Sequence, residues 1–165
     1  MNTNNLTDRL MGILTFKAPT YKAVAEDKTA TPTAAAIVVI VALVTGILGS
    51  VFTGFSLGGI IGGVIAVLLA WLIGAFVLAF VAQSFFQGKT DTGEMLRMTG
   101  FAQIFSLLGI IPLIGWLLAL VGLIVAYVIG IREAAEIDTT KAVLTGMITI
   151  VILFFVRLIL AIFLH

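Results

Sequence analysis

The chain has 165 residues, of which 61% are apolar and only 10% are charged, and its formal net charge is +1. Soluble domains carry about 25% charged residues, so this composition excludes an ordinary soluble domain and predicts an all-α polytopic membrane protein. The near-zero net charge provides no basic surface for nucleic acid. The absence of cysteine excludes disulfides and thiolate metal sites.

Residues 1–32 form a polar-to-mixed arm ahead of the membrane domain, which we place at residues 33–165. Apolar residues in the arm recur with helical spacing and predict a short amphipathic helix; they are Leu6, Leu10, Ile13 and Leu14. Pro19 then favours the start of a second short helix that runs to Asp27. Two placements of the arm are open: in the membrane interface, or packed on the cytosolic ends of the spans.

Five segments are long and apolar enough to cross a bilayer, which takes roughly 20 residues. We predict transmembrane helices at about residues 33–52, 60–86, 95–111, 113–131 and 142–164. The run from Met95 to Ile131 would be about 55 Å long as one helix, too long for a single crossing. Pro112 and Gly115 supply a break, because proline removes a backbone donor and glycine relaxes the turn.

Local patterns predict how some of these helices begin and pack. Asp91 and Glu94 have the spacing of a capping box at the start of the third span. Thr139 or Thr140 is available to cap the fifth. Small residues spaced four apart in the second span predict a face that another helix backbone approaches closely; they are Gly58, Gly59, Gly62 and Gly63.

Eight of the nine lysine and arginine residues fall on one side of this topology, in the arm and in two loops. By the positive-inside rule, the amino terminus is cytoplasmic and the carboxyl terminus lies outside. The exception is Arg157, in the last span. It lies 16 residues after Lys141, about 24 Å along a helix, so it either snorkels outward or has a buried functional partner.

Polar residues in or beside the spans are the candidate functional positions. Those within spans are Arg157, Gln83 and Gln103. Those in the two charged loops are Asp91, Glu94, Arg97, Arg132, Glu133 and Lys141. The spacing of the loop carboxylates matches no calcium-binding loop and favours helix capping. The only histidine is His165, so we expect no catalytic, metal-binding or cofactor-binding residue.

Several short motifs taken together resemble the Yip family of five-span membrane proteins. They are Phe16-Lys17-Ala18-Pro19 before the first span, the stretch from Gly88 to Leu96, Phe101-Ala102-Gln103 with the Ile111-Pro112 turn, Ile129 to Glu133, and Thr140-Lys141-Ala142. The resemblance implies a multi-pass α-helical protein with a cytosolic amino terminus. It also implies the setting of eukaryotic members, which is ER and Golgi trafficking in complexes with one another and with prenylated Rab-type GTPases.

This chain departs from that pattern because it lacks a long cytosolic amino-terminal region, and so resembles a compact prokaryotic member. The expected location is the cytoplasmic membrane in a prokaryote, or the ER and Golgi in a eukaryote. The expected function is that of a non-enzymatic scaffold or partner-binding protein in membrane organisation or trafficking. Expected partners are the lipid bilayer and other membrane proteins or a second copy, with a small GTPase by family analogy alone. The alternative is a small transporter or channel subunit with a polar path formed by Arg157, Gln83 and Gln103.

Overall fold

The computed structural model describes residues 5–163, apart from the side chains at positions 52, 53, 160 and 163, and its regular elements are all helices. The two arm helices are α1 (Leu6–Leu14) and α2 (Ala18–Glu26), followed by the 3-10 segment η1 (Lys28–Ala30). The remaining elements are α3 (Thr31–Thr53), α4 (Leu57–Phe86), α5 (Thr92–Ala102), the 3-10 segment η2 (Gln103–Ile110), α6 (Gly115–Ala135) and α7 (Thr139–Phe163).

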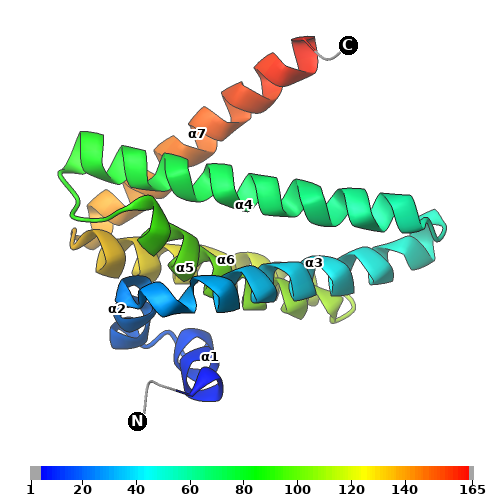
Figure 1. The fold of residues 1–165 in the computed structure, drawn as a ribbon, viewed down its shortest axis with the longest axis horizontal. Helices are drawn as coiled ribbons and strands as arrows, with labels where there is room; N and C mark the ends of the chain where they lie inside the picture. The colour runs from blue at the N-terminus through cyan, green and yellow to red at the C-terminus, as the bar shows by residue number, and fades with distance from the viewer. Residues whose placement is uncertain (1–4, 164–165) are drawn as a thin grey trace.

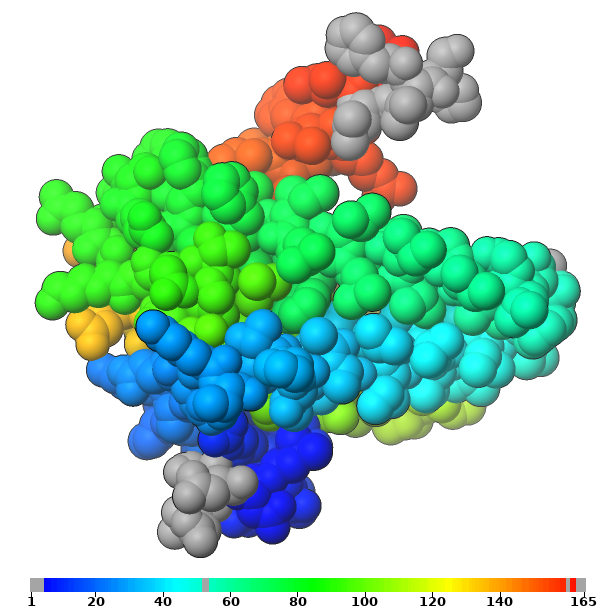
Figure 2. Space-filling model, in the orientation of Figure 1, coloured from blue at the N-terminus to red at the C-terminus, as the bar shows by residue number. Residues whose placement is uncertain are grey.

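Helices α3, α4 and α6 run roughly along one direction and α7 is inclined to them, and the connecting loops lie at two opposite ends of these three helices (Figure 1). One end carries α2 and the connections at residues 87–91 and 136–138, and we call it the charged end. The turns at residues 54–56 and 111–114 lie at the other end. The amino-terminal arm starts near the charged end, and α7 leads away from it. Figure 2 shows the carboxyl-terminal part of α7 projecting beyond the body formed by α3 and α4.

Within the described residues, four helices are long and apolar enough to span a membrane: Lys28–Val51, Leu57–Phe86, Gly115–Ala135 and Thr139–Ile159. They correspond to four of the five predicted spans, with bounds shifted by a few residues. The chain is therefore a multi-pass membrane protein. The predicted third span, residues 95–111, is not one α-helix: the 11-residue α5 is followed by eight residues of 3-10 helix. Hydropathy cannot reveal this change, because both helix types present the same apolar composition.

The arm and the long helices share one hydrophobic core. Tyr21 of α2, Met98 and Phe101 of α5 and Ile131 of α6 are fully buried in the same cluster. The ring of Phe16, between the arm helices, stacks on Phe105 of η2 with centroids 5.1 Å apart. So α2 packs on the ends of the long helices. Helix α1 also leaves apolar side chains exposed, namely Leu6 and Met11.

Close helix packing occurs at different glycines from those predicted. A Cβ added at Gly58, Gly62 or Gly63 would meet no neighbouring atom within 4 Å, so no described helix lies against that face of α4. At Gly100 of α5, an added Cβ would lie 2.8 Å from the Cβ of Ala34 in α3. The prediction failed because the spacing of small residues marks a face open to close approach, but not whether this chain supplies the partner.

The start of α5 confirms the capping-box prediction. The Asp91 carboxylate accepts the Glu94 N–H at 2.7 Å, and the Glu94 carboxylate accepts the Asp91 N–H at 3.3 Å. The cap predicted for the last helix was wrong. Helix α7 already includes Thr139, and the carboxylate of Asp138 accepts the Lys141 N–H at 2.9 Å. Aspartate in this position satisfies an amide that the helix cannot pair itself.

Candidate functional site at the charged end

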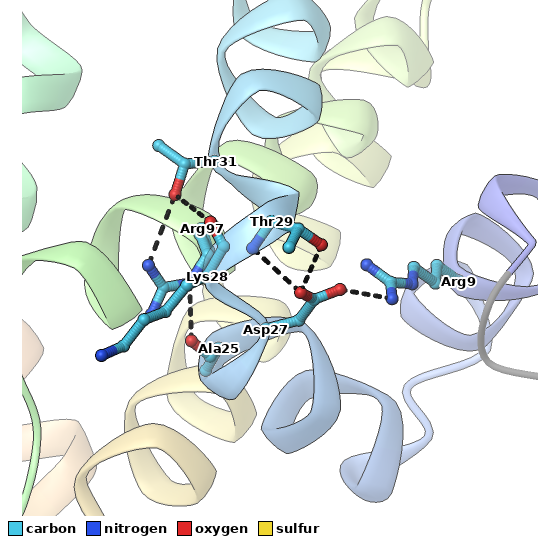
Figure 3. Close-up of polar contacts among 7 residues, drawn as sticks. All are labelled: Arg9, Ala25, Asp27, Lys28, Thr29, Thr31 and Arg97. Atoms are coloured by element: carbon cyan, nitrogen blue, oxygen red, sulfur yellow. Dashed lines mark hydrogen bonds and ion pairs between the residues drawn. The ribbon is translucent and has the colours of Figure 1, made fainter.

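The junction between the arm and the first long helix is built around Asp27. Its carboxylate accepts the Thr29 hydroxyl at 2.6 Å and the Thr29 N–H at 2.9 Å, and it forms a 2.6 Å ion pair with Arg9 of α1 (Figure 3). The hydrogen bond from the Thr29 hydroxyl and the contact with Arg9 hold the pKa of Asp27 below its ordinary value. These contacts fix the angle at which α2 leads into α3.

Arg97 of α5 holds the same junction from the opposite side. Its Nε–H donates to the carbonyl oxygen of Ala25 at 2.7 Å, and its Nη1 donates to the hydroxyl of Thr31 at 3.3 Å (Figure 3). The side chain is buried, and it forms no ion pair within residues 5–163. Ala25 lies in the last turn of α2, where unpaired carbonyls and the helix dipole favour a cation. Arg97 therefore joins α5 to α2 and α3.

Glu136 joins three segments that are far apart in the sequence. Its carboxylate lies 2.8 Å from Lys22 Nζ of α2 and 3.7 Å from Lys89 Nζ of the 87–91 connection. The Lys22 hydrogen bond and charge, followed by the Lys89 charge, hold the pKa of Glu136 below its ordinary value. The same hydrogen bond raises the pKa of Lys22. We call this group, Lys22, Lys89 and Glu136, the clasp.

The sequence analysis did not select the clasp, because its contacts join residues that no local pattern relates. Lys22 and Glu136 are separated by 114 positions. One backbone bond supports the arrangement: the Lys89 N–H donates to the Ala135 carbonyl at 2.9 Å. Glu136 itself has a positive φ of 53° at the end of α6, a conformation that glycine or asparagine adopts more readily.

The other predicted loop residues make contacts near their own positions. Asp91 and Glu94 form the capping box, Arg132 pairs with Glu133 at 2.8 Å, and Lys141 lies 3.6 Å from Asp138. None of these contacts reaches a residue of the clasp. Within the described residues, no three histidine, cysteine, aspartate or glutamate side chains are arranged to hold a metal ion.

The three polar residues predicted within the spans have different surroundings and do not form one site. Gln83 is exposed and donates its Nε2 to the Thr90 carbonyl oxygen at 2.6 Å, so it supports the 87–91 connection. Arg157 is exposed on α7 and forms no hydrogen bond or ion pair with the residues that the structure describes. Of these three, only Gln103 lines the cavity between the long helices.

That cavity has a volume of about 750 Å³ and lies among α3, α4, α5, η2, α6 and α7. Its lining is mostly apolar. The polar residues in it are Thr45, Thr99, Gln103, Ser106, Tyr127 and Thr149. The sequence analysis missed Tyr127 and Thr149, because a single tyrosine or threonine in an apolar run is ordinary and its direction cannot be read without the packing.

Comparison with known proteins identifies one family. The model of the Yip1 domain matches residues 11–161, from within α1 to near the end of α7. The match therefore includes the clasp, the Arg97 contacts and the cavity. Neither the curated proteins nor the solved structures include a match to this chain.

Proposed function

The chain belongs to the Yip1 domain family, and on this premise we propose that it is a non-enzymatic membrane scaffold that binds partner proteins through its charged end. It is an integral membrane protein with several apolar helices. The site of contact is the surface where the arm and the two charged connections meet. Its role is to hold a partner against the membrane, in membrane organisation or trafficking.

The observation that carries this proposal is that contacts within the chain itself hold the charged end in one arrangement. The clasp joins the arm to both connections. Arg97 of α5 also holds the end of α2, through its hydrogen bond to the carbonyl oxygen of Ala25. A rigid surface loses less conformational entropy on binding than a loose one. A fixed arrangement of charges therefore favours recognition of a folded partner.

The signs of the exposed charges at this end indicate what kind of partner fits. The exposed charged residues here comprise four basic and four acidic side chains: Lys17, Lys28, Lys89 and Lys141, with Glu26, Asp91, Glu136 and Asp138. Anionic lipid attracts clusters of four to eight basic residues without intervening acids. A mixed surface instead favours a protein of complementary charge, either another membrane protein or a second copy of this chain.

Five crossings remain our proposal for the topology. Eleven residues of α5 rise about 16 Å, and eight of 3-10 helix rise about 16 Å more, since each 3-10 residue advances about 2.0 Å. Together they cover the roughly 30 Å of a hydrocarbon core. With the basic residues at the charged end, the positive-inside rule places that end in the cytoplasm and the end of α7 outside.

The proposal is tested by crosslinking in native membranes followed by purification in mild detergent. Lys28→Glu with Lys141→Glu reverses two exposed charges, and we expect it to abolish specific crosslinks. Leu113→Gln, at the opposite end and almost fully exposed, is the matched control and should retain them. A chain that is monomeric and without partners in native membranes would overturn the scaffold function.

A transporter or channel subunit is the second candidate, and the cavity with Gln103 in its lining is the observation that favours it. Its path would run through Gln103 and not through Arg157 or Gln83, which do not line the cavity. Solute flux in proteoliposomes tests it. Under this candidate Gln103→Leu abolishes flux and Arg157→Leu leaves it unchanged, whereas absence of flux from the unmodified protein rejects the candidate.

A further inference from the structure

We propose that the cavity among the long helices binds a neutral lipid that carries a carbonyl group, such as an ester of glycerol or a quinone. The lipid's apolar part would lie against the apolar lining, and its carbonyl oxygen would accept hydrogen bonds from polar side chains in the middle of the bundle. This ligand site is separate from the charged end, and it does not depend on the scaffold function.

A buried hydroxyl without a partner is the strongest sign of a ligand. Thr149 of α7 is only 4% exposed and lines the cavity, and its Oγ1 is buried without a hydrogen-bond partner among the described residues. Threonine in a helix commonly donates to a carbonyl one turn earlier. Thr145, one turn before it in α7, does so, donating to Lys141 O at 2.8 Å. An unpaired hydroxyl in apolar surroundings is costly, and a ligand oxygen would remove that cost.

Other polar groups of the cavity leave donors available in the same region. The Thr45 hydroxyl donates to Val41 O at 2.8 Å and the Thr99 hydroxyl to Met95 O at 2.6 Å, so both are already used. Gln103 accepts from Ser106 through Oε1 at 3.0 Å, and its amide N–H groups have no partner among the described residues. Tyr127 also lines the cavity, and its hydroxyl is a further potential donor. The cavity therefore offers donors and calls for a ligand that accepts.

The donor groups of Thr149, Tyr127 and Gln103 lie at similar depths in the bundle. Thr149 is ten residues into α7, Tyr127 is eight residues before the end of α6, and Gln103 follows the eleven residues of α5. At 1.5 Å per residue these positions are about 12–16 Å from the charged end of each helix, near the centre of a 30 Å hydrocarbon core. A carbonyl at that depth would lie in the same layer of the bundle as these groups.

The charge and volume of the cavity restrict the class of ligand further. No charged side chain lines it, so an anionic or cationic headgroup would be desolvated without a counter-charge. Its volume of about 750 Å³ falls within the 300–1,000 Å³ of small-molecule sites. A neutral polar group attached to an apolar chain satisfies the charge, the donors and the volume together.

Photocrosslinking of the purified full-length chain in phosphatidylcholine nanodiscs tests the proposal. The probes are a diazirine-labelled diacylglycerol, a diazirine-labelled quinone and a diazirine-labelled alkane of equal length, each mapped by peptide mass spectrometry. Unlabelled diacylglycerol and quinone serve as competitors. We expect at least one of the two carbonyl-bearing probes to label peptides that line the cavity and to be displaced by its unlabelled form.

Two pairs of variants make the result specific. Thr149→Val removes the hydroxyl and keeps the shape, and should weaken competition about 3- to 10-fold, the equivalent of one interhelical hydrogen bond in lipid. Thr145→Val on the same helix removes a hydroxyl that is already used, and should change nothing. Gly74→Trp places a large side chain in the cavity, where an added Cβ meets no atom within 4 Å, and should abolish labelling. Gly62→Trp, outside the cavity lining on the same helix, should not.

The unlabelled competitors distinguish the two classes of carbonyl-bearing lipid. Displacement of the probe by diacylglycerol alone indicates an ester, and displacement by quinone alone indicates a quinone. Equal labelling by the alkane probe, or labelling that Thr149→Val and Gly74→Trp leave unchanged, would overturn the proposal. So would crosslinks through cavity residues to a second copy of the chain, which would show that a helix fills the space.

Discussion

The guanidinium of Arg97 is buried and donates its Nε–H to the carbonyl oxygen of Ala25 at 2.7 Å, across 72 positions of sequence. The acceptor belongs to the last turn of α2, so the cation replaces the hydrogen bonds that a helix end lacks. The arm is thus attached to the membrane helices by this buried hydrogen bond, in addition to the ion pairs of the clasp on the surface.

Removing the Arg97 donors should release the arm. Arg97→Met keeps much of the apolar stem but leaves the Ala25 carbonyl without a partner, which costs about 1.5–3 kcal/mol for a bond to a charged group. We expect trypsin to cleave at Lys22 and Lys28 roughly ten times faster or more, because cleavage follows the population of the open arm. Digestion in detergent followed by mass spectrometry gives the rates.

Arg132→Gln is the control for this experiment, since Arg132 contacts only Glu133 and Thr139 among the described residues. It should leave the rate of arm cleavage unchanged. Cleavage of Arg97→Met at the unmodified rate would show that the core contacts of α2 hold the arm without Arg97.

The clasp should loosen in acid. The pKa of Glu136 in the folded chain lies below its unfolded value of about 4.3, so the clasp stabilises the fold above about pH 4.3 and this contribution is lost as the pH falls through the lower, folded pKa. Lys22 stays charged throughout, because its raised pKa lies far above this range. We expect the arm to move away from the 136–138 connection in that window.

Spin labels at Thr15→Cys and Thr140→Cys, both exposed in a chain that has no cysteine of its own, would measure this movement. Their distance distribution should broaden between pH 5 and pH 3. Glu136→Gln should show the broader distribution already at pH 7, while Glu26→Gln, whose carboxylate is 3.8 Å from Lys22, should not. Asp27 also has a lowered pKa. Any further broadening that Glu136→Gln shows when the pH falls below 4 is therefore assigned to the junction around Asp27.

The glycines of α5 and α4 should respond oppositely to alanine. Gly100→Ala would set a Cβ 3.1 Å from the backbone oxygen of Ala34 and 3.1 Å from the ring of Trp71, and neither can move aside easily. Overpacking of this kind costs about 1–3 kcal/mol. Gly62→Ala meets no atom within 4 Å and should be neutral, or stabilising by up to about 1 kcal/mol. Thermal unfolding in detergent compares the two, and equal melting temperatures would contradict the close packing of α3 and α5.

The features that were predictable from the sequence are those that a short stretch of chain decides. Helical spacing in the arm, four of the five long apolar runs and the Asp91–Glu94 capping box depend on residues a few positions apart, and these agree with the structure. Capping is local because an aspartate side chain can reach only the amides two or three residues further on.

The features that were not predictable depend on packing between distant segments. Arg97 was selected as a loop charge, whereas it is buried against Ala25. The clasp, the buried hydroxyl of Thr149 and the change to 3-10 helix at Gln103 have no local signature. In η2, Phe105 packs where an added Cβ on Gly122 would collide with its ring. We infer that this tight contact between η2 and α6 accompanies the change to 3-10 helix. Hydropathy alone cannot predict such a contact.

The final prediction concerns the path of α5 and η2 through the bilayer. Because the chain contains no cysteine, single substitutions can be labelled from one side of a sealed membrane with an impermeant maleimide. We expect Lys89→Cys and Lys141→Cys to react from the cytoplasmic side, and Phe55→Cys and Leu113→Cys from the other. Leu113 decides the question, because it is 96% exposed. It belongs to the 111–114 turn, which lies at the end opposite the 87–91 connection (Figure 1). If it reacted from the same side as Lys89, η2 would not cross, and the count of spans would be four; reaction from the opposite side establishes that 3-10 helix completes the third crossing.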